Sequence, residues 1–368
     1  MPLHTCAGCG ALLPYEGLCR KCREEKQRRE ILAWTPEEVA HRQRALLEEL
    51  PALERMDDQA ERDFWALLSC WDGITPDIQR AALAQGVRSP VELFYHAPED
   101  VRDGLIDALL QTESPGEANC LMCCVAMQGD DKALETLLEL ERNPRPWQES
   151  LYVPPSVYAQ CGGWTFDSAG VRRMLHFETC YPLVQGEPGV DSPVRVAQPR
   201  EERCPHCGSR LVDLLVVDGR EPRLHFLGVD GIIKATCCPV CTMYSEPVFS
   251  RFTLEGESTM LPFEPDWVDE MVKEEMEEDY PKFTANGLAL GEKRVPLFYG
   301  GNEKNIDLLG GFADWVQDWN YTPCPDCGKP MKFLAQIQWG ALLGGGEGTI
   351  YVELCPECRI TSMQYQQS

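Results

Sequence analysis

"TPCPDCGKPMKFLAQI", residues 322 to 337, places two cysteines three positions apart and continues into an apolar, strand-like run. Nearly the same phrase, "ERCPHCGSRLVDLLVV", occurs at residues 202 to 217. Each phrase is closed by a second pair, "CPVC" at 238 to 241 and "CPEC" at 355 to 358. Both units therefore follow one order: CPxCG, strand, loop, glycine-containing turn, strand, CPxC. We interpret them as an internal duplication of a β unit that carries a zinc ribbon.

The spacing of these cysteines has a chemical reason. A CxxC turn brings two thiolates within reach of one ion, and two such turns complete a tetrahedral four-sulfur shell. Because that shell has no vacant position for an activated water, such sites are structural. The expected ligands of the two units are Cys204, Cys207, Cys238 and Cys241, and Cys324, Cys327, Cys355 and Cys358. Cys237 directly precedes Cys238 and is an alternative ligand, but the symmetry of the two CPxC pairs favours Cys238.

A third set of cysteines opens the chain. "CAGCGALLPYEGLCRKC", residues 6 to 22, holds two CxxC pairs, Cys6 with Cys9 and Cys19 with Cys22, and has little core of its own. We expect a minimal zinc ribbon over residues 1–30, whose fold depends on the metal. The sequence thus predicts about three structural Zn²⁺ ions. Seven cysteines remain: Cys70, Cys120, Cys123, Cys124, Cys161, Cys180 and Cys237. "CLMCC" at 120 to 124 is expected to be an apolar helix with buried thiols.

Composition limits the class of protein. The chain has 368 residues, 43% hydrophobic and 25% charged, as in ordinary globular proteins of two or three domains. The net charge of −25 repels phosphate backbones, so we expect no nucleic-acid partner. No apolar run is long enough to span a bilayer, and "MPLHTCAGCG" has neither a basic start nor an apolar core. We therefore expect a cytoplasmic protein without a membrane partner, in a compartment where CxxC pairs bind metal rather than form disulfides.

Residues 31–150 are expected to form an α-helical array, with irregular HEAT-like pairs as one possibility. Thr35-Pro36 with Glu38, Ser89-Pro90 with Glu92, and Ser114-Pro115 with Glu117 each combine a capping hydroxyl, a proline and a glutamate three residues after the cap. Thr75-Pro76 has the cap and the proline only. Residues 151–368 are rich in strand and turn residues, and one helix is expected around 264 to 279. The predicted fold class is α+β: a short zinc ribbon, a helical array and a β-rich domain with two four-cysteine sites.

The helix around 264 to 279 is strongly acidic. "EPDWVDEMVKEEMEEDY", residues 264 to 280, carries nine acidic residues against Lys273 alone. Val268, Met271, Val272 and Met276 fall near one helical face, which we expect to dock on the β core. The remaining face would hold the candidate partner-binding residues in water: Glu270, Glu274, Glu277 and Glu278. The simpler interpretation is a solvated face that keeps the protein soluble.

No catalytic constellation is apparent in the sequence. It lacks GxSxG, HExxH and Walker motifs, and a deaminase would need a glutamate motif that is missing here. "GGGEG" at 344 to 348 lies between two expected strands, so we interpret it as a loop rather than a phosphate cradle. His206 sits within a CxxC turn and is expected to be a spacer. We expect no enzyme activity and no catalytic residues.

The C-terminal sequence resembles the YwqG-like family of bacterial proteins. The resemblance rests on "LLGGFADWVQDWNYTPCPDCGKPMKFLAQIQW" and "GGGEGTIYVELCPECRITSMQYQQS", about 60 residues that carry the GGF, WVQ, CPxCG, FLAQI and final CPxC features. Members of that family are largely without assigned activity and are often encoded beside polymorphic toxins as candidate immunity proteins. Residues 1–150 lie outside the resemblance.

The resemblance implies a cytoplasmic, zinc-stabilised immunity protein that binds a toxin domain and occludes its active site. An acidic inhibitor suits a basic toxin cleft, although nuclease and ADP-ribosyltransferase toxins are not distinguished. Two alternatives from other classes are a zinc-containing enzyme of unknown reaction and a non-catalytic scaffold in nucleic-acid handling.

Overall fold

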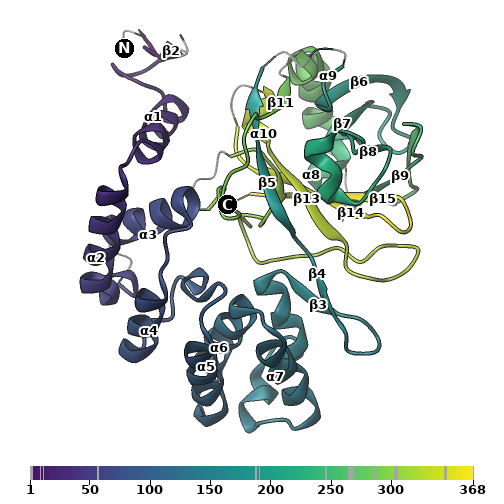
Figure 1. Ribbon diagram of the computed structural model, residues 1–368. Coiled ribbons are helices and arrows are strands. Elements are labelled where there is room, and N and C mark those ends of the chain that lie inside the picture. The colour runs from purple at the N-terminus through teal and green to yellow at the C-terminus, as the bar shows by residue number, and fades with distance from the viewer. Residues whose placement is uncertain are drawn as a thin grey trace.

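A computed structural model describes residues 3–367 apart from 9, 11, 56–57, 187–188, 190, 245–246, 264–267, 269, 286, 302–305 and 344–345, and leaves out the side chains at 20, 21, 58 and 244. Helices from the N-terminal part of the chain lie beside a β-rich part formed by the remainder (Figure 1). Cysteine groups lie near the N-terminus and within the β-rich part. The predicted mixed fold is confirmed.

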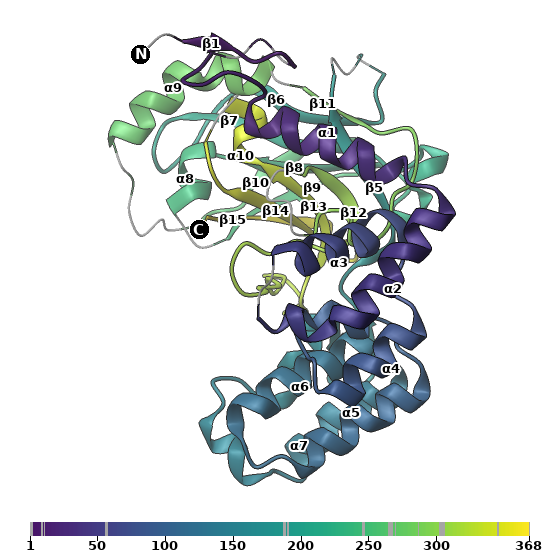
Figure 2. The same cartoon turned by 90° about the vertical axis from the view of Figure 1, so that its left-hand side faces the viewer.

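The N-terminal segment is a two-stranded hairpin followed by a helix. Strands β1 (His4–Thr5) and β2 (Leu12–Leu13) pair antiparallel, and α1 (Arg20–Leu32) begins after Cys19. In Figure 2, α1 runs between this hairpin and α2 (Pro36–Leu53). Arg28 holds α1 against the β-rich part, because its Nη1 donates a hydrogen bond to the Tyr299 carbonyl at 2.8 Å and its guanidinium lies 4.1 Å from the centre of the Tyr299 ring.

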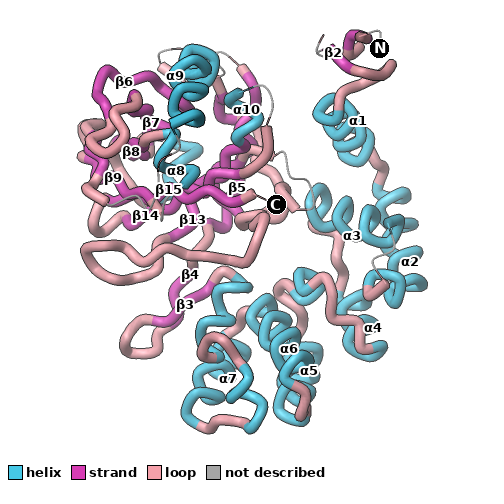
Figure 3. The backbone as a smooth tube through the Cα atoms, turned by 180° about the vertical axis from the view of Figure 1, so that it is seen from behind, coloured by secondary structure: helices cyan, strands magenta, loops and turns pink. Residues whose placement is uncertain are grey.

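The helical array follows from α2 to α7, and its helices form a curved row (Figure 3). After α2 come α3 (Asp58–Trp71), α4 (Pro76–Gln85), α5 (Glu99–Gln111), α6 (Pro115–Gln128) and α7 (Asp131–Arg142). The caps explain several of these starts. Thr35 and Glu38 form a complete capping box at α2, the Ser114 hydroxyl accepts the Glu117 N–H at α6, and Asp130 accepts the Ala133 N–H at α7.

The prediction that an α-helix starts at Ser89-Pro90 is wrong. This segment forms a 3₁₀ turn, η1 (Val91–Phe94), whose cap position is Pro90 rather than Ser89. The Ser89 N–H instead donates to the Glu54 carboxylate at 3.1 Å, so Ser89 contacts the C-terminal end of α2. Because η1 lasts only four residues, Glu92 has no α-helical first turn to cap and its carboxylate is available for another role.

The helical core continues beyond residue 150. The 3₁₀ segments η2 (Pro146–Ser150) and η3 (Pro155–Gly162) pack on α6 and α7, and Trp147, Tyr158 and Trp164 belong to the same apolar cluster as the helices. A Cβ on Gly162 would lie 1.9 Å from the Ala126 carbonyl oxygen, so only glycine permits η3 to approach α6 this closely.

The β-rich part contains an eight-stranded antiparallel sheet and a three-stranded one. The order in the large sheet is β10 (Ser258–Met260), β9 (Val248–Phe252), β15 (Ile360–Gln366), β14 (Thr349–Cys355), β13 (Lys332–Gln338), β12 (Leu308–Gly311), β5 (Phe177–Gln185) and β11 (Leu288–Leu290). The small sheet orders β6 (Val194–Arg203), β7 (Arg210–Asp218) and β8 (Ile232–Cys237). Leu214 of the small sheet and Val352 of the large sheet lie in one apolar core. A separate hairpin joins β3 (Trp164–Phe166) to β4 (Arg172–Met174).

Three short elements complete this part of the chain. They are η4 (Pro222–Leu227), α8 (Pro239–Tyr244) and α10 (Trp339–Leu343). The expected loop at 344 to 348 connects α10 to β14, and residues 344–345 of it lie outside the described chain.

The hairpins β7–β8 and β13–β14 are built alike. Each follows a CPxCG turn, and each contains a β-bulge at the same distance from its first cysteine, between Asp213 and Leu215 in one and between Phe333 and Ala335 in the other. They differ at the closing pair, because α8 begins between Cys238 and Cys241 in one, whereas the other turns directly from Cys355 and Cys358 into β15.

The acidic helix α9 (Glu270–Ala285) ends later than predicted, and its buried face matches the predicted one only in part. Met276, Tyr280 and Phe283 pack inward, whereas Met271, expected on the docking face, is 69% exposed. The helix continues through Pro281, which has no N–H for the Glu277 carbonyl four residues earlier. Arg210 Nη2 donates to that carbonyl instead, at 3.3 Å. The start predicted at residue 264 falls on residues outside the described chain.

None of the helices in the described ranges is long and apolar enough to cross a membrane.

Candidate metal centres

Three groups of cysteine thiols meet the geometric requirement for a metal site, namely ligand atoms within 4.8 Å of one another. In the first group, Cys6 follows β1, Cys19 caps α1 and Cys22 lies in the first turn of α1. The Cys19 N–H donates to Cys6 Sγ at 3.2 Å, and the Cys22 N–H donates to Cys19 Sγ at 3.4 Å. These donors, together with the helix N-terminus, favour the thiolate form. The fourth expected ligand, Cys9, lies outside the described residues.

The second group is the most enclosed. Cys204 and Cys207 come from the turn between β6 and β7, while Cys238 and Cys241 come from the start of α8, and all four are buried. The turn is closed by the Gly208 N–H, which donates to the Cys204 carbonyl at 2.9 Å, and by the Cys204 N–H, which donates to the Ser209 carbonyl at 2.8 Å. Gly208 has a φ of +78°, which explains why glycine follows the second cysteine.

The third group repeats this turn between residue 322 and β13. The Gly328 N–H donates to the Cys324 carbonyl and the Cys324 N–H donates to the Lys329 carbonyl, both at 2.8 Å, and Gly328 has a φ of +70°. Cys355 ends β14, and Cys358 follows in the turn before β15. Exposure separates the two groups, because Cys327 is exposed whereas every thiol of the second group is buried.

The sulfur positions fit one tetrahedral ion in each complete group. Thiolates at about 2.3 Å from a tetrahedral ion lie roughly 3.8 Å from one another. The Sγ atoms of Cys204 and Cys241 lie 3.8 Å apart, those of Cys207 and Cys238 lie 3.4 Å apart, and those of Cys327 and Cys355 lie 3.8 Å apart. These separations are far from the bond length of a disulfide, and the cysteines are free thiols.

Crowding of the thiols in the second group opposes their joint ionisation. The Cys204 thiol beside Cys207 lowers the pKa of Cys207, whereas the same neighbour raises the pKa of Cys238. One thiolate therefore suppresses the ionisation of the next. A bound divalent cation removes this conflict, so the arrangement suits metal binding with a closed sulfur shell and no position for a substrate.

Cys237 lies outside the second group, as the symmetry of the sequence indicated. It ends β8 as a fully buried side chain, and burial raises its pKa to about 12. The cysteines of "CLMCC" lie on α6, where Cys123 and Cys124 are buried in the helical core. Cys180 of β5 is likewise buried, and burial raises its pKa to about 12. These thiols behave as small apolar side chains.

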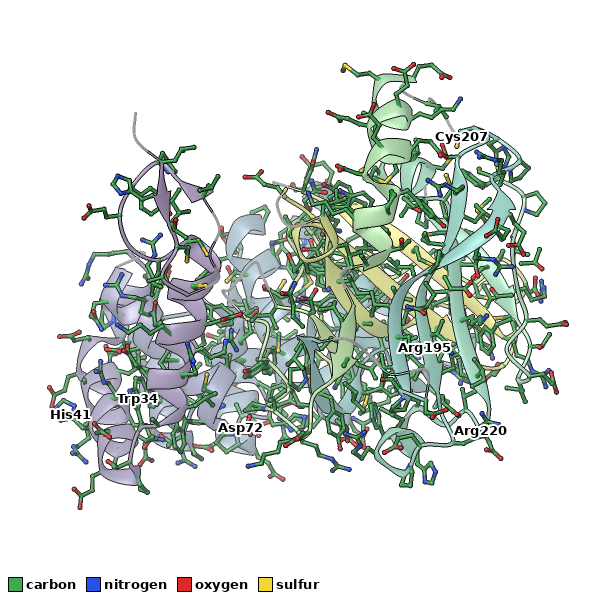
Figure 4. All side chains as sticks on the ribbon, turned by 90° about the horizontal axis from the view of Figure 1, so that it is seen from above. Trp34, His41, Asp72, Arg195, Cys207 and Arg220 are labelled. Carbon is green, nitrogen blue, oxygen red and sulfur yellow. The ribbon has the colours of Figure 1, made fainter. Side chains whose placement is uncertain are left out.

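The histidines do not join the cysteine groups found among the described residues. His206, the expected spacer, lies with its ring centre 4.3 Å from that of Phe263. Figure 4 shows His41 at the outer edge of the helical side and Cys207 on the opposite side of the molecule, beside α9. His176 is buried, and its Nδ1 lies 3.2 Å from the Gly163 carbonyl, to which it donates in the neutral ring.

The predicted partner-binding glutamates do not share one environment. Glu270, Glu274 and Glu278 are exposed on α9, as expected. Glu277 is a correction: it is 32% exposed and bonded to Arg210, whose N–H donates to Glu277 Oε1 at 3.0 Å and whose Nε lies 3.3 Å from Oε2. Arg203 adds a third contact at 3.5 Å. Glu277 therefore joins α9 to the turn of the second cysteine group.

A cavity lies between the helical array and the β-rich part, and the sequence did not predict it. A cavity of about 280 Å³ is lined by aromatic and acidic side chains from α3, η1, α6, η3 and the segment 298–321. No sequence motif predicts this cavity, because the segments that line it are far apart in the sequence. The density of tryptophan in "FADWVQDWNY", residues 312 to 321, was the available signal.

Comparisons with known proteins give one relative of undescribed activity. The chain is 31% identical, over 283 residues, to "Uncharacterized protein YpfL" of Salmonella typhimurium strain LT2, a match that covers 75% of this chain and 64% of that protein. The chain thus spans less than two thirds of the length of this relative. No family model matches the sequence. No solved structure matches it either.

Proposed function

We propose that this protein is a zinc-stabilised immunity protein that binds a toxin domain and occludes its active site. The resemblance of the C-terminal region to the YwqG-like family supports this function. The all-sulfur groups support a structural role for zinc, because a closed four-thiolate shell contributes folding energy rather than chemistry.

The exposed face of α9 is the observation that carries the proposal. Met271, Glu274, Glu275 and Glu278 are spaced as i, i+3, i+4 and i+7, so they form one stripe along the helix. Met271 is 69% exposed at one end of this stripe, and Glu270 stands beside it. An apolar side chain bordered by charges is typical of an interface, where the apolar group anchors and the charged rim selects the partner.

The charge of this stripe supports a basic partner. Lys273 contacts Glu270 at 3.1 Å, and the other lysine of α9, Lys282, lies in its last turn. Among the described residues, no ion pair joins a lysine to Glu274, Glu275 or Glu278. A basic cleft on a toxin domain complements such a surface and is drawn to it over several ångströms at low salt. Opposite charge then accelerates association, and burial of Met271 slows dissociation.

The test is a variant in which Glu270, Glu274 and Glu278 are changed to Gln. A toxin domain encoded beside the gene is expected to kill cells that lack this protein and to spare those that produce it. With that domain as the partner, the triple variant should associate roughly tenfold more slowly than the parent at low salt, and the difference should shrink as salt rises. Stopped-flow or biosensor measurements give the association rate.

The matched control changes Glu113, Glu135 and Glu149 to Gln, which alters the net charge equally at exposed sites on the helical part. Equal association rates for the two triple variants would show that only net charge matters and would remove α9 as the contact. Survival of cells that produce the toxin domain without this protein would contradict the immunity function itself.

A further inference from the structure

The cavity between the helical array and the β-rich part has walls of aromatic rings. Trp65 projects from α3, and Phe298, Phe312, Trp315, Trp319 and Tyr321 come from the segment that precedes β13. At about 280 Å³, the cavity suits a single side chain or a small molecule rather than a dinucleotide.

These walls are held in place by contacts beyond the cavity. Phe298 and Phe312 stack with ring centres 4.5 Å apart, and Trp315 meets Tyr321 edge to face at 5.3 Å. The Val316 N–H donates to the Tyr351 hydroxyl and the Asp314 N–H donates to Gln336 Oε1, each at 2.9 Å. Because β13 and β14 fix the loop in this way, the cavity is formed before any ligand arrives.

The charge within the cavity is acidic. Glu92, Asp314 and Asp318 line it, and none of the lining residues in the described chain is Lys, Arg or His. Glu92 is half-buried on η1, and its carboxylate accepts a hydrogen bond from its own backbone N–H. No basic side chain among the described residues forms an ion pair with it. Burial raises the pKa of Glu92, as expected for a carboxyl that lacks a compensating cation.

Aromatic faces around an uncompensated carboxylate select an organic cation. The faces attract positive charge through the ring quadrupole, and a half-buried carboxylate needs N–H donors. A quaternary ammonium offers no donor, whereas a planar guanidinium stacks on an indole and donates two parallel hydrogen bonds to one carboxylate. We propose that this cavity binds a guanidinium group, with Glu92 as its anion and the tryptophans as its stacking surface. This inference is independent of the proposed function and of the α9 surface.

The test compares two ligands of the same shape with the full-length protein. n-Propylguanidinium carries the charge, and n-propylurea is its neutral counterpart. Calorimetry, together with the fluorescence of the lining tryptophans, should show binding of the guanidinium at least about tenfold tighter than that of the urea, as expected for a charge-assisted hydrogen bond. Equal binding of both ligands, or binding of neither, would overturn the proposal.

Variants then locate the site. Glu92→Gln keeps the shape of the side chain and should weaken n-propylguanidinium binding by about tenfold. Glu113→Gln makes the same charge change at an exposed site and should leave binding unchanged. Trp319→Leu removes one aromatic face and should also weaken binding. Unchanged affinity of a folded Glu92→Gln protein would place the ligand elsewhere and reject this site.

The source of the guanidinium is resolved by a third ligand, the blocked tripeptide acetyl-Gly-Arg-Gly-amide, compared with its citrulline counterpart. Arginine-dependent binding of the peptide identifies the ligand as an arginine side chain of a protein. Binding of n-propylguanidinium without binding of the peptide identifies a free guanidino compound. Both results support the site. Binding of n-propylurea as tight as that of n-propylguanidinium would still reject it.

Discussion

At the residue scale, Cys237 and Cys238 are adjacent in sequence and have opposite environments. Cys238 shares its group with Cys204, Cys207 and Cys241, whereas Cys237 faces the core at the end of β8. The spacing of the CxxC pairs was sufficient to predict which of the described cysteines lie together in groups, because a closed sulfur shell requires that spacing. The deeply buried carboxylates and aromatic contacts carry no such local signature and could not be predicted.

Changing each of these two cysteines to serine separates their roles. Cys238→Ser should bind one metal ion fewer and lose several kcal/mol of unfolding free energy, since structural zinc contributes on the order of 10 kcal/mol to small domains. Cys237→Ser should keep the full metal content. Metal analysis and urea unfolding check both variants, and equal metal content in the two proteins would show that Cys238 is not a ligand.

His176 should make stability depend on pH. Burial lowers its pKa to about 3, below the usual 6.5, so the unfolded chain binds a proton that the folded chain does not. This contribution to stability is complete above pH 6.5 and is lost as the pH falls from 6.5 toward 3, by up to about 1.4 kcal/mol per pH unit. His176→Phe keeps a ring against Phe312, which lies 4.0 Å away, and should show a flatter decline in urea unfolding between pH 7 and pH 5. Parallel declines in parent and variant would contradict this assignment.

At the element scale, α9 shows what periodicity could not establish. The pattern of Val268, Met271, Val272 and Met276 predicted one docking face; Val268 and Met276 pack on the β core, Met271 is exposed, and the helix passes through Pro281 to bury Tyr280 and Phe283 as well. Sequence rules end a helix at proline, and they could not foresee that Arg210 would take over the carbonyl left without a partner. By contrast, Thr35 and Ser114 predicted α2 and α6 correctly because caps act within a few residues.

The two CPxCG turns share a backbone but differ in exposure, which predicts an order of metal release. A chromogenic chelator should remove the ion of the third group, where Cys327 is exposed, before that of the buried second group. Of the two release phases that belong to these groups, Cys324→Ser should abolish the faster and Cys204→Ser the slower, while the ion of the first group is still released in both variants. Loss of the slower phase in Cys324→Ser would reverse the assignment and show that exposure of the thiols does not govern release.

At the scale of the whole molecule, the order of the helical and β-rich parts along the chain was predictable from the sequence, but the contacts between them were not. Composition and caps separated the helical array from the β-rich part. The packing of the N-terminal helical part against the β-rich part depends on pairs far apart in sequence, such as Arg28 with Tyr299 and Tyr95 with Phe298. The aromatic cavity arises at this contact, so no single segment could reveal it.

The central claim is that cysteine groups hold this molecule together by binding metal. The most direct test is the metal content of the full-length chain, purified under reducing conditions and measured by elemental analysis and native mass spectrometry. We expect about three zinc ions per chain, one for each of the three cysteine groups. One ion or none in fresh, reduced protein would contradict the claim.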